Sequence, residues 1–234
     1  MQLHLSRRRL LAALGLAIIG ALSLVLTNRK LLRIAQTRLS APPPMPLIVP
    51  REAWGARQPN HDAPNESGFA PVPTSPEWYV YPQPLEYVYY TVAIHHSAAL
   101  LTSDETVLDI QNLHMDKNGW ADVGYHYGID SNGVIYEGRD IGARGASVAG
   151  YNTGTIGIVV MGNFEVDTPL PAQLTAAQTL VNWLTYTYLL THLAAHREFN
   201  NESLCPGANM LPHLDKLAQN AGLQRGTGGY VQPV

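Results

Sequence analysis

The sequence predicts an α/β domain in which a mixed central β-sheet is flanked by helices, with a hydrophobic helix at the N-terminus. Residues 156–161 form an uninterrupted apolar run, which is typical of a strand buried on both faces. Segments 103–116 and 175–188 repeat apolar residues at helical spacing. Because strand-like and helix-like segments alternate along the chain, a layered α/β fold is expected.

Three other parts of the chain have the pattern of strands. Residues 86–94 are rich in Tyr, Val and Thr and predict the central strand of the sheet. Segments 125–129 and 134–137 flank a Ser-Asn-Gly turn and predict a hairpin. Residues 193–195 should form a short strand that ends immediately before a histidine.

Helix starts are marked by capping residues and by proline. A Thr-x-x-Glu box at 102–105 predicts a helix over 103–116, and a Thr-x-x-Gln box at 175–178 predicts a second. Pro212 should lie in the first turn of a last helix that extends to about Gln219. The residues expected to face the core are Val107, Ile110 and Leu113 in the first helix and Ala177, Leu180, Val181, Leu184 and Tyr188 in the second.

An apolar segment precedes the domain. Residues 10–26 consist of Leu, Ala, Ile, Val, Gly and one Ser, and three arginines precede them. This is the lower limit for a membrane-spanning helix but exceeds most signal-peptide cores. We therefore expect residues 1–38 to be a membrane anchor or an uncleaved signal. The arginines also resemble a twin-arginine export signal, so the export route stays open.

The remaining chain divides into a spacer, one folded domain and a tail. Residues 39–48 are a Pro-rich spacer, and 49–220 are expected to fold as one domain. Within it, the Pro-rich stretch 58–84 lacks any period and is expected to be an ordered surface insert. The Gly-rich residues 221–234 should be a flexible tail.

Charge and cysteine content exclude some classes of function. Seven of the 15 basic residues lie in 1–38 with no acid, so the rest holds eight basic against 18 acidic residues, a net charge of −10. An acidic body argues against a nucleic-acid partner. Cys205 is the only cysteine, so no intrachain disulfide is possible.

Two histidines and this cysteine suggest a metal site. His95, His196 and Cys205 offer two neutral nitrogens and one thiolate, a set that suits Zn²⁺ and leaves a fourth position open, as catalytic zinc requires. The two histidines are 101 positions apart, so only folding could unite them. The ordinary alternative is that Cys205 is a small buried hydrophobic residue.

The order of several motifs resembles a known family. These motifs are segments 50–56, 94–97, 119–126, 150–152, 156–158, 195–197 and 205–207. From about Val49 to Leu217 the chain thus resembles the peptidoglycan recognition proteins and the phage-type (type 2) N-acetylmuramoyl-L-alanine amidases.

The resemblance implies a reaction and the residues that perform it. His95, His196 and Cys205 match the zinc ligands, and the bond cut is the amide between the lactyl group of N-acetylmuramic acid and L-alanine. Tyr125 matches the catalytic tyrosine, whose hydroxyl would hydrogen-bond the attacking water or the developing oxyanion. Ser203 stands where these amidases carry Thr or Lys, so the rate is in doubt more than the reaction.

The resemblance also implies substrate contacts. His114 matches a groove position, although a histidine that stabilises a helix end is an equal alternative. Gly119, Trp120 and Arg139 match the residues of members selective for diaminopimelate-type peptidoglycan. A guanidinium can hold the extra carboxylate of diaminopimelate bidentately.

His96 is adjacent to the predicted metal ligand His95, so its side chain should point to the opposite face of the strand.

Four readings remain. The first is an exported zinc amidase, membrane-anchored or secreted and taken as a monomer. The second is a non-catalytic module that binds muropeptide; such members typically lose the cysteine, which this chain keeps. The third is a cytosolic recycling amidase, which would use Asp as third ligand and would leave the apolar leader unexplained. A purely structural membrane protein would hold no metal.

Overall fold

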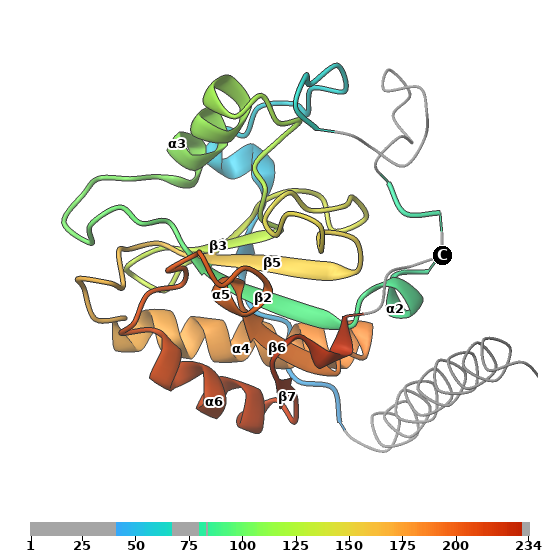
Figure 1. Ribbon diagram of the computed structural model, residues 1–234, viewed down its shortest axis with the longest axis vertical. Helices are drawn as coiled ribbons and strands as arrows, with labels where there is room; N and C mark the ends of the chain where they lie inside the picture. Colours follow the sequence, from blue (N-terminus) through green and yellow to red (C-terminus); the bar gives the residue numbers. More distant parts are fainter. Residues whose placement is uncertain (1–40, 67–79, 83, 231–234) are drawn as a thin grey trace, which may run out of the picture. The chain divides into compact units, whose positions relative to one another are not determined.

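The computed structural model describes residues 41–66, 80–82 and 84–230 (Figure 1). The N-terminal hydrophobic helix expected in 1–38 lies outside the described residues. Within the described ranges, no helix combines the length and apolar character needed to cross a membrane.

The described strands are β1 (Ile48–Val49), β2 (Thr91–His96), β3 (Tyr127–Ile129), β4 (Ile135–Glu137), β5 (Thr155–Val160), β6 (His192–Ala195) and β7 (Gln224–Arg225). The described helices are α2 (Leu85–Val88), α3 (Val107–Asn112), α4 (Pro171–Tyr188), α5 (His196–Phe199) and α6 (Leu211–Asn220), with shorter turns η1 (Arg51–Trp54), η2 (Leu113–Lys117) and η3 (Thr227–Gly229).

The strands form one mixed sheet, as predicted. Its order is β1-β4-β3-β5-β2-β6-β7. β3 and β4 form the predicted antiparallel hairpin, whereas β2 is parallel to both of its neighbours, β5 and β6. Parallel strands place their carboxyl ends at one edge of a sheet, and this edge is where ligand sites form in such folds.

Helices cover both faces of the sheet. In Figure 1, α4 and α6 lie on one face and α3 on the other. The larger core lies on the α4 side and includes Ile94 and Leu180, while Val107 and Val159 belong to a smaller core beneath α3. Because side chains alternate along a strand, His95 points away from the α4-side core that Ile94 joins.

The predicted central strand begins later than expected. Leu85–Val88 form the helical turn α2, and the strand covers only Thr91–His96. Pro84 precedes this turn, and the Tyr89 N–H closes it on the Leu85 carbonyl at 2.9 Å. The β-propensity of Tyr and Val was therefore overridden by local turn geometry, because such propensity depends on context.

The first predicted helix has a different cap, and of its three predicted core residues Val107 and Ile110 are buried while Leu113 is not. Its capping box is Thr106–Asp109, not 102–105: the Asp109 N–H donates to Thr106 Oγ1 at 3.2 Å, and the Thr106 N–H donates to Asp109 Oδ2 at 2.8 Å. The π-turn η2 follows α3 and adds a residue to the turn. Leu113 is therefore 52% exposed, while His114 is buried.

The second predicted helix starts four residues early, at Pro171. Gln173 Oε1 accepts the Leu170 N–H at 3.1 Å, so this side chain caps the helix. Thr175 lies within the helix, where its hydroxyl donates to the Pro171 carbonyl at 2.8 Å. The predicted inward residues of this helix are buried or packed against the core, as expected.

The tail predicted to be flexible from residue 221 adds a seventh strand. β7 pairs with β6 in parallel register. Arg225 holds it there through Asp215 at 2.9 Å and Glu198 at 3.0 Å. A Gly-rich composition thus did not prevent pairing, because a cation and two carboxylates fix the strand edge.

Candidate metal centre and adjoining groove

The three predicted metal ligands meet at the edge where the parallel strands end. His95 is the fifth residue of β2, and His196 follows β6 directly. Cys205 comes from the loop after α5, whose Arg197 N–H donates to the Cys205 carbonyl at 2.9 Å. The ligand atoms of the three residues all lie within 4.8 Å of one another.

The spacing of two ligand atoms matches a shared ion. Cys205 Sγ lies 3.6 Å from His95 Nδ1. A sulfur at about 2.3 Å and a nitrogen at about 2.0–2.1 Å from one zinc ion lie about 3.5 Å apart at a tetrahedral angle. Two imidazoles and one thiolate therefore fit zinc and leave one coordination position open.

Burial sets the protonation of the three groups. Burial, reinforced by the nearby His196, holds the pKa of His95 well below its usual value, and burial also lowers the pKa of His196. Both rings are therefore neutral at pH 7, as metal ligation requires. Burial raises the pKa of the Cys205 thiol to about 12, so the thiolate form requires a nearby cation. The His96 N–H supports that form by donating to Sγ at 3.3 Å.

His96 points to the opposite face, as predicted from strand alternation. Its Nδ1 accepts the Phe164 N–H at 3.2 Å, and its ring lies 6.3 Å from that of Phe164. Phe164 belongs to the α4-side core. The imidazole of His96 is therefore structural, and only its backbone reaches the cysteine.

Gly207 brings the cysteine loop against the sheet. Its φ of +96° lies in the left-handed region, and an added Cβ would sit 2.3 Å from the Phe164 carbonyl carbon. Only glycine fits this contact without movement of the backbone. The Cys-Pro-Gly motif is thus explained by close packing beside the ligand sulfur.

Ser203 shapes the same loop. Its Oγ accepts the Cys205 N–H at 3.2 Å, and its carbonyl accepts from Arg197 Nε at 3.3 Å. Since Oγ accepts in this bond, its own O–H is left for another acceptor. The catalytic role expected of Ser203 stays a prediction.

Tyr125 packs directly on the ligand cluster. Its ring centroid lies 4.9 Å from that of His95 and 5.4 Å from that of His114. Its carbonyl accepts the Arg139 N–H at 2.8 Å, which fixes the backbone before β3. Burial, then the nearby Cys205 and Glu105, raises the pKa of the hydroxyl, so it stays protonated and able to donate.

His114 is buried beside Tyr125 and contacts two neighbouring residues. Its Nδ1 accepts the Gly124 N–H at 2.9 Å, and its ring lies 4.6 Å from that of Trp120 at a tilt of 48°. Burial, and secondarily Arg139, lowers the pKa of His114 to about 4. A ring with this pKa is neutral at pH 7, which argues against a positive charge that stabilises a helix end, and the predicted groove role of His114 stays a prediction.

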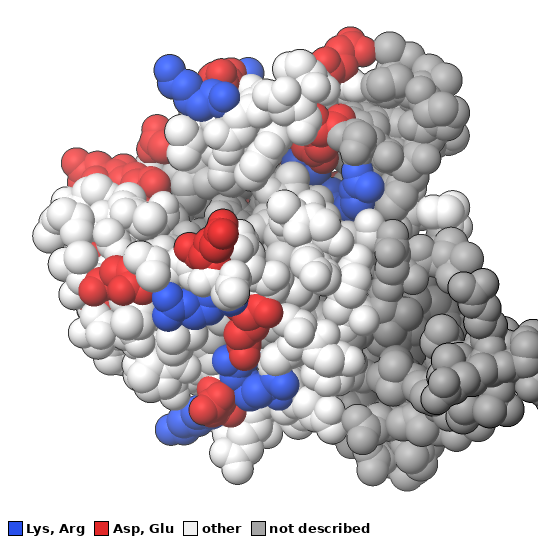
Figure 2. All heavy atoms as spheres, in the orientation of Figure 1, with Lys and Arg blue, Asp and Glu red and all other residues white. Residues whose placement is uncertain are grey.

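A groove adjoins one of the candidate metal ligands, His196, which forms part of its lining. Trp120, Asn65, Glu66 and Arg144 also line it. Its other lining residues are Gly145, Ala146, Ser147, Ala149, Asn152 and Asn200. In Figure 2, charged side chains on the viewed face lie in mixed acidic and basic groups.

Gly119 lies against the insert residues Pro64 and Asn65. Its φ is +68°, and an added Cβ would lie 2.8 Å from Asn65 Nδ2. The Asn65 N–H donates to the Gly119 carbonyl at 3.1 Å. In this structure Gly119 permits close approach of the insert.

Arg139 is fully occupied by protein partners. Its side chain is 0% exposed and forms a bidentate ion pair with Glu66. The remaining N–H groups donate to the carbonyls of Val123, Arg144 and Asp122. The predicted grip on a substrate carboxylate therefore requires Glu66 to leave, and stays a prediction.

Sequence reasoning singled out only Trp120 and His196 among the groove residues, and it missed Glu66 and Asn152 among others. Glu66 lies in the insert, where no pattern distinguishes it from neighbouring polar residues. Asn152 Oδ1 accepts the N–H groups of Ser147 and Val148 at 2.8 and 2.7 Å and so shapes the groove wall. The Gly-Tyr-Asn motif was the available signal for Asn152, although not for its role.

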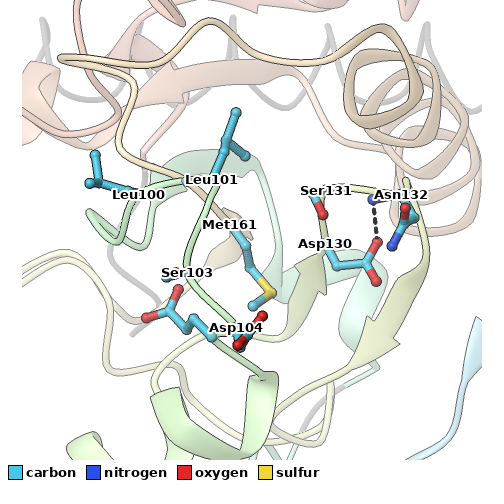
Figure 3. Close-up of a pocket in the computed structure, with 10 residues that line it drawn as sticks. Leu100, Leu101, Ser103, Asp104, Asp130, Ser131, Asn132 and Met161 are labelled. Carbon is cyan, nitrogen blue, oxygen red and sulfur yellow. Dashed lines mark hydrogen bonds between the residues drawn. The ribbon is translucent and has the colours of Figure 1, made fainter.

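None of the three candidate metal ligands lines a second hollow, which Figure 3 shows. Leu100, Asp104, Asp130 and Met161 line it. Asp130 Oδ1 accepts the Asn132 N–H at 2.9 Å, drawn as a dashed line, and its Oδ2 accepts the Tyr136 hydroxyl at 3.0 Å. This carboxylate therefore serves the hairpin turn.

The chain matches a protein-family model and is similar in sequence to known proteins. The sequence model of the N-acetylmuramoyl-L-alanine amidase family matches residues 87–208. Peptidoglycan-recognition protein LB of Drosophila melanogaster is 28% identical over 202 residues, which cover 80% of this chain and 78% of that protein.

Two solved structures give the same result. The N-acetylmuramoyl-L-alanine amidase LysC from Clostridium intestinale is 27% identical with a TM-score of 0.54, covering 62% of this chain and 93% of its own. A mutant of Drosophila PGRP-LB in complex with tracheal cytotoxin is 28% identical with a TM-score of 0.55, covering 69% and 89%. The chain therefore belongs to the family of N-acetylmuramoyl-L-alanine amidases and peptidoglycan recognition proteins.

Proposed function

We propose that this chain is a zinc-dependent N-acetylmuramoyl-L-alanine amidase. It would hydrolyse the amide between the lactyl group of N-acetylmuramic acid and the L-alanine of the stem peptide. The observation that carries the proposal is the convergence of His95, His196 and Cys205 within 4.8 Å, with His196 also lining the groove. A substrate in that groove would thus reach the open coordination position.

The three ligands would hold the zinc ion, and other residues would act on the substrate. When bound, zinc lowers the pKa of a water molecule to about 7 and polarises a carbonyl group. Tyr125, protonated and packed 4.9 Å from the His95 ring, would donate a hydrogen bond to the developing oxyanion. Ser203 would add a weaker donor, because a hydroxyl lacks the charge of Lys.

Trp120 and the neighbouring groove residues would position the stem peptide. The resemblance assigns a preference for diaminopimelate-type peptidoglycan to Gly119, Trp120 and Arg139, and we include that preference in the proposal. Peptidoglycan, the proposed substrate, lies outside the cytoplasm. We therefore also propose that the chain is exported and either anchored by residues 1–38 or secreted.

A non-catalytic recognition module is the second candidate. Several relatives are named for recognition, including one solved with tracheal cytotoxin. This reading needs a groove but neither a metal ligand set nor Tyr125. The retained sulfur, 3.6 Å from His95 Nδ1, favours the enzyme.

The product distinguishes the two candidates. The full chain, supplied with zinc, should release free stem peptides with a new L-alanine amino terminus from purified diaminopimelate-type sacculi, detected by amino-group labelling and mass spectrometry. Binding to sacculi without any new amino terminus would support the recognition module instead. A zinc chelator is the matched control, since it should abolish release without removing the groove.

A further inference from the structure

The ion pair between Arg139 and Glu66 joins the segment that follows β4 to the insert. All five N–H groups of the guanidinium are engaged: two bond the carboxylate of Glu66, one of them at 2.9 Å, and three bond the carbonyls described above. The side chains of Arg139 and Glu66 are 0% and 7% exposed. No donor of this guanidinium is left for a ligand.

Glu66 is held in place by more than charge. Its Oε2 also accepts the Ala121 N–H at 2.8 Å. Beside it, Asn65 Nδ2 donates to the Asn118 carbonyl at 2.9 Å, and the Asn60 N–H donates to the Ala121 carbonyl at 2.7 Å. The segment 60–66 is therefore fastened along the loop that contains Gly119 and Trp120.

A planar, bidentate carboxylate is the ligand that a buried arginine fork is shaped to hold. The carboxylate in this fork comes from the protein's own insert, at the position where our proposed function puts a substrate carboxylate. We propose that Glu66 is a specificity-determining residue: it occupies the Arg139 site as a tethered competitor of the diaminopimelate carboxylate. This inference rests on the proposed function.

The physical consequence is a weaker preference for diaminopimelate-type over lysine-type peptides. A tethered group competes at a high effective concentration, commonly millimolar or more for short flexible links. The diaminopimelate carboxylate must displace Glu66 before it gains the two hydrogen bonds of the fork, whereas a lysine-type peptide has no such carboxylate and meets no such competition. Glu66 therefore reduces the difference in affinity between the two peptide types.

Binding measurements test this directly. Calorimetry should compare matched muropeptides that differ only in diaminopimelate or lysine, using the full chain and its Glu66→Gln variant. We expect the diaminopimelate-to-lysine affinity ratio to rise at least tenfold in Glu66→Gln, since the amide keeps the size of the side chain but loses the charge. Glu52→Gln, which removes an exposed carboxylate elsewhere, should leave the ratio unchanged. An unchanged or lower ratio in Glu66→Gln overturns the proposal.

A second variant separates this proposal from the proposed function. Glu66→Ala should open a carboxylate-sized space beside Arg139, so acetate should raise the melting temperature of this variant but not that of the wild type, relative to chloride at equal ionic strength. Acetate without effect on Glu66→Ala also overturns the proposal. Because this readout needs neither zinc nor muropeptide, it stands even if the chain hydrolyses nothing; loss of all muropeptide binding would instead count against the proposed function.

Discussion

Cys205 Sγ lies 3.6 Å from His95 Nδ1, although the residues are 110 positions apart. Three separate features produce this approach: β2 ends at the edge of the sheet, β6 ends beside it, and Gly207 allows the cysteine loop to touch Phe164. None of the three is needed by a buried cysteine that serves only as packing. The arrangement therefore favours a metal centre over a core residue.

Tyr125→Phe should lower kcat and leave zinc content unchanged. The change removes one hydroxyl donor beside the ligand cluster but no metal ligand. Loss of one oxyanion donor costs about 10²–10³-fold in rate. Steady-state release of stem peptide and metal analysis check this. Tyr136→Phe is the control, because its hydroxyl bonds Asp130 in the hairpin turn. Equal rates for wild type and Tyr125→Phe would remove Tyr125 from the mechanism.

Gly207→Ala should destabilise the protein and weaken metal binding together. The new Cβ would lie 2.3 Å from the Phe164 carbonyl carbon, and the φ of +96° adds strain. Gly55→Ala is a matched control, since its φ is +75° but nothing lies within 4 Å of its Cβ position. We expect about 1 kcal/mol for the control and several for Gly207→Ala. Denaturant unfolding measures the loss of stability in each variant. Similar losses for Gly207→Ala and Gly55→Ala would argue against the close contact at Gly207.

Stability should fall with decreasing pH in a way that depends on His126. Burial is the main cause that lowers the pKa of His126 to about 4 from 6.5. The folded state therefore binds the His126 proton less tightly than the unfolded state does. The contribution of the neutral ring to the free energy of unfolding is complete above pH 6.5 and is lost as pH falls toward 4.

The dependence of the unfolding free energy on pH gives the size of the His126 effect. One such group contributes about 1.4 kcal/mol per pH unit within that window. His126→Gln should remove about this slope from the unfolding free energy, measured by urea titration at several pH values. Identical slopes for wild type and variant would show that the ring titrates normally in the folded protein.

The sequence predicted the parts of the site that local patterns mark. Alternation along β2 placed His95 and His96 on opposite faces, and the apolar run at 156–161 indicated a buried strand. The ligand set followed from a resemblance spread over several motifs, since His95 and His196 have no local relationship.

Tertiary context decided the features that were missed. The π-turn after α3 rotated the helix face, so His114 is buried where Leu113 was expected. Thr102 and Thr106 both begin a plausible capping box, and only the folded chain selects between them. Glu66 lies in an aperiodic insert, and its partner Arg139 is 73 positions away, so no sequence pattern links them.

The most direct test of the account is the zinc content and amidase turnover of the full chain beside those of Cys205→Ser. The wild type should hold about one zinc per chain and release stem peptides from sacculi, with activity lost to a chelator and restored by zinc. His213→Ala, which changes a histidine outside the cluster, should match the wild type. Cys205→Ser should lose both metal and turnover. A serine variant with full zinc and full turnover would contradict the assigned centre.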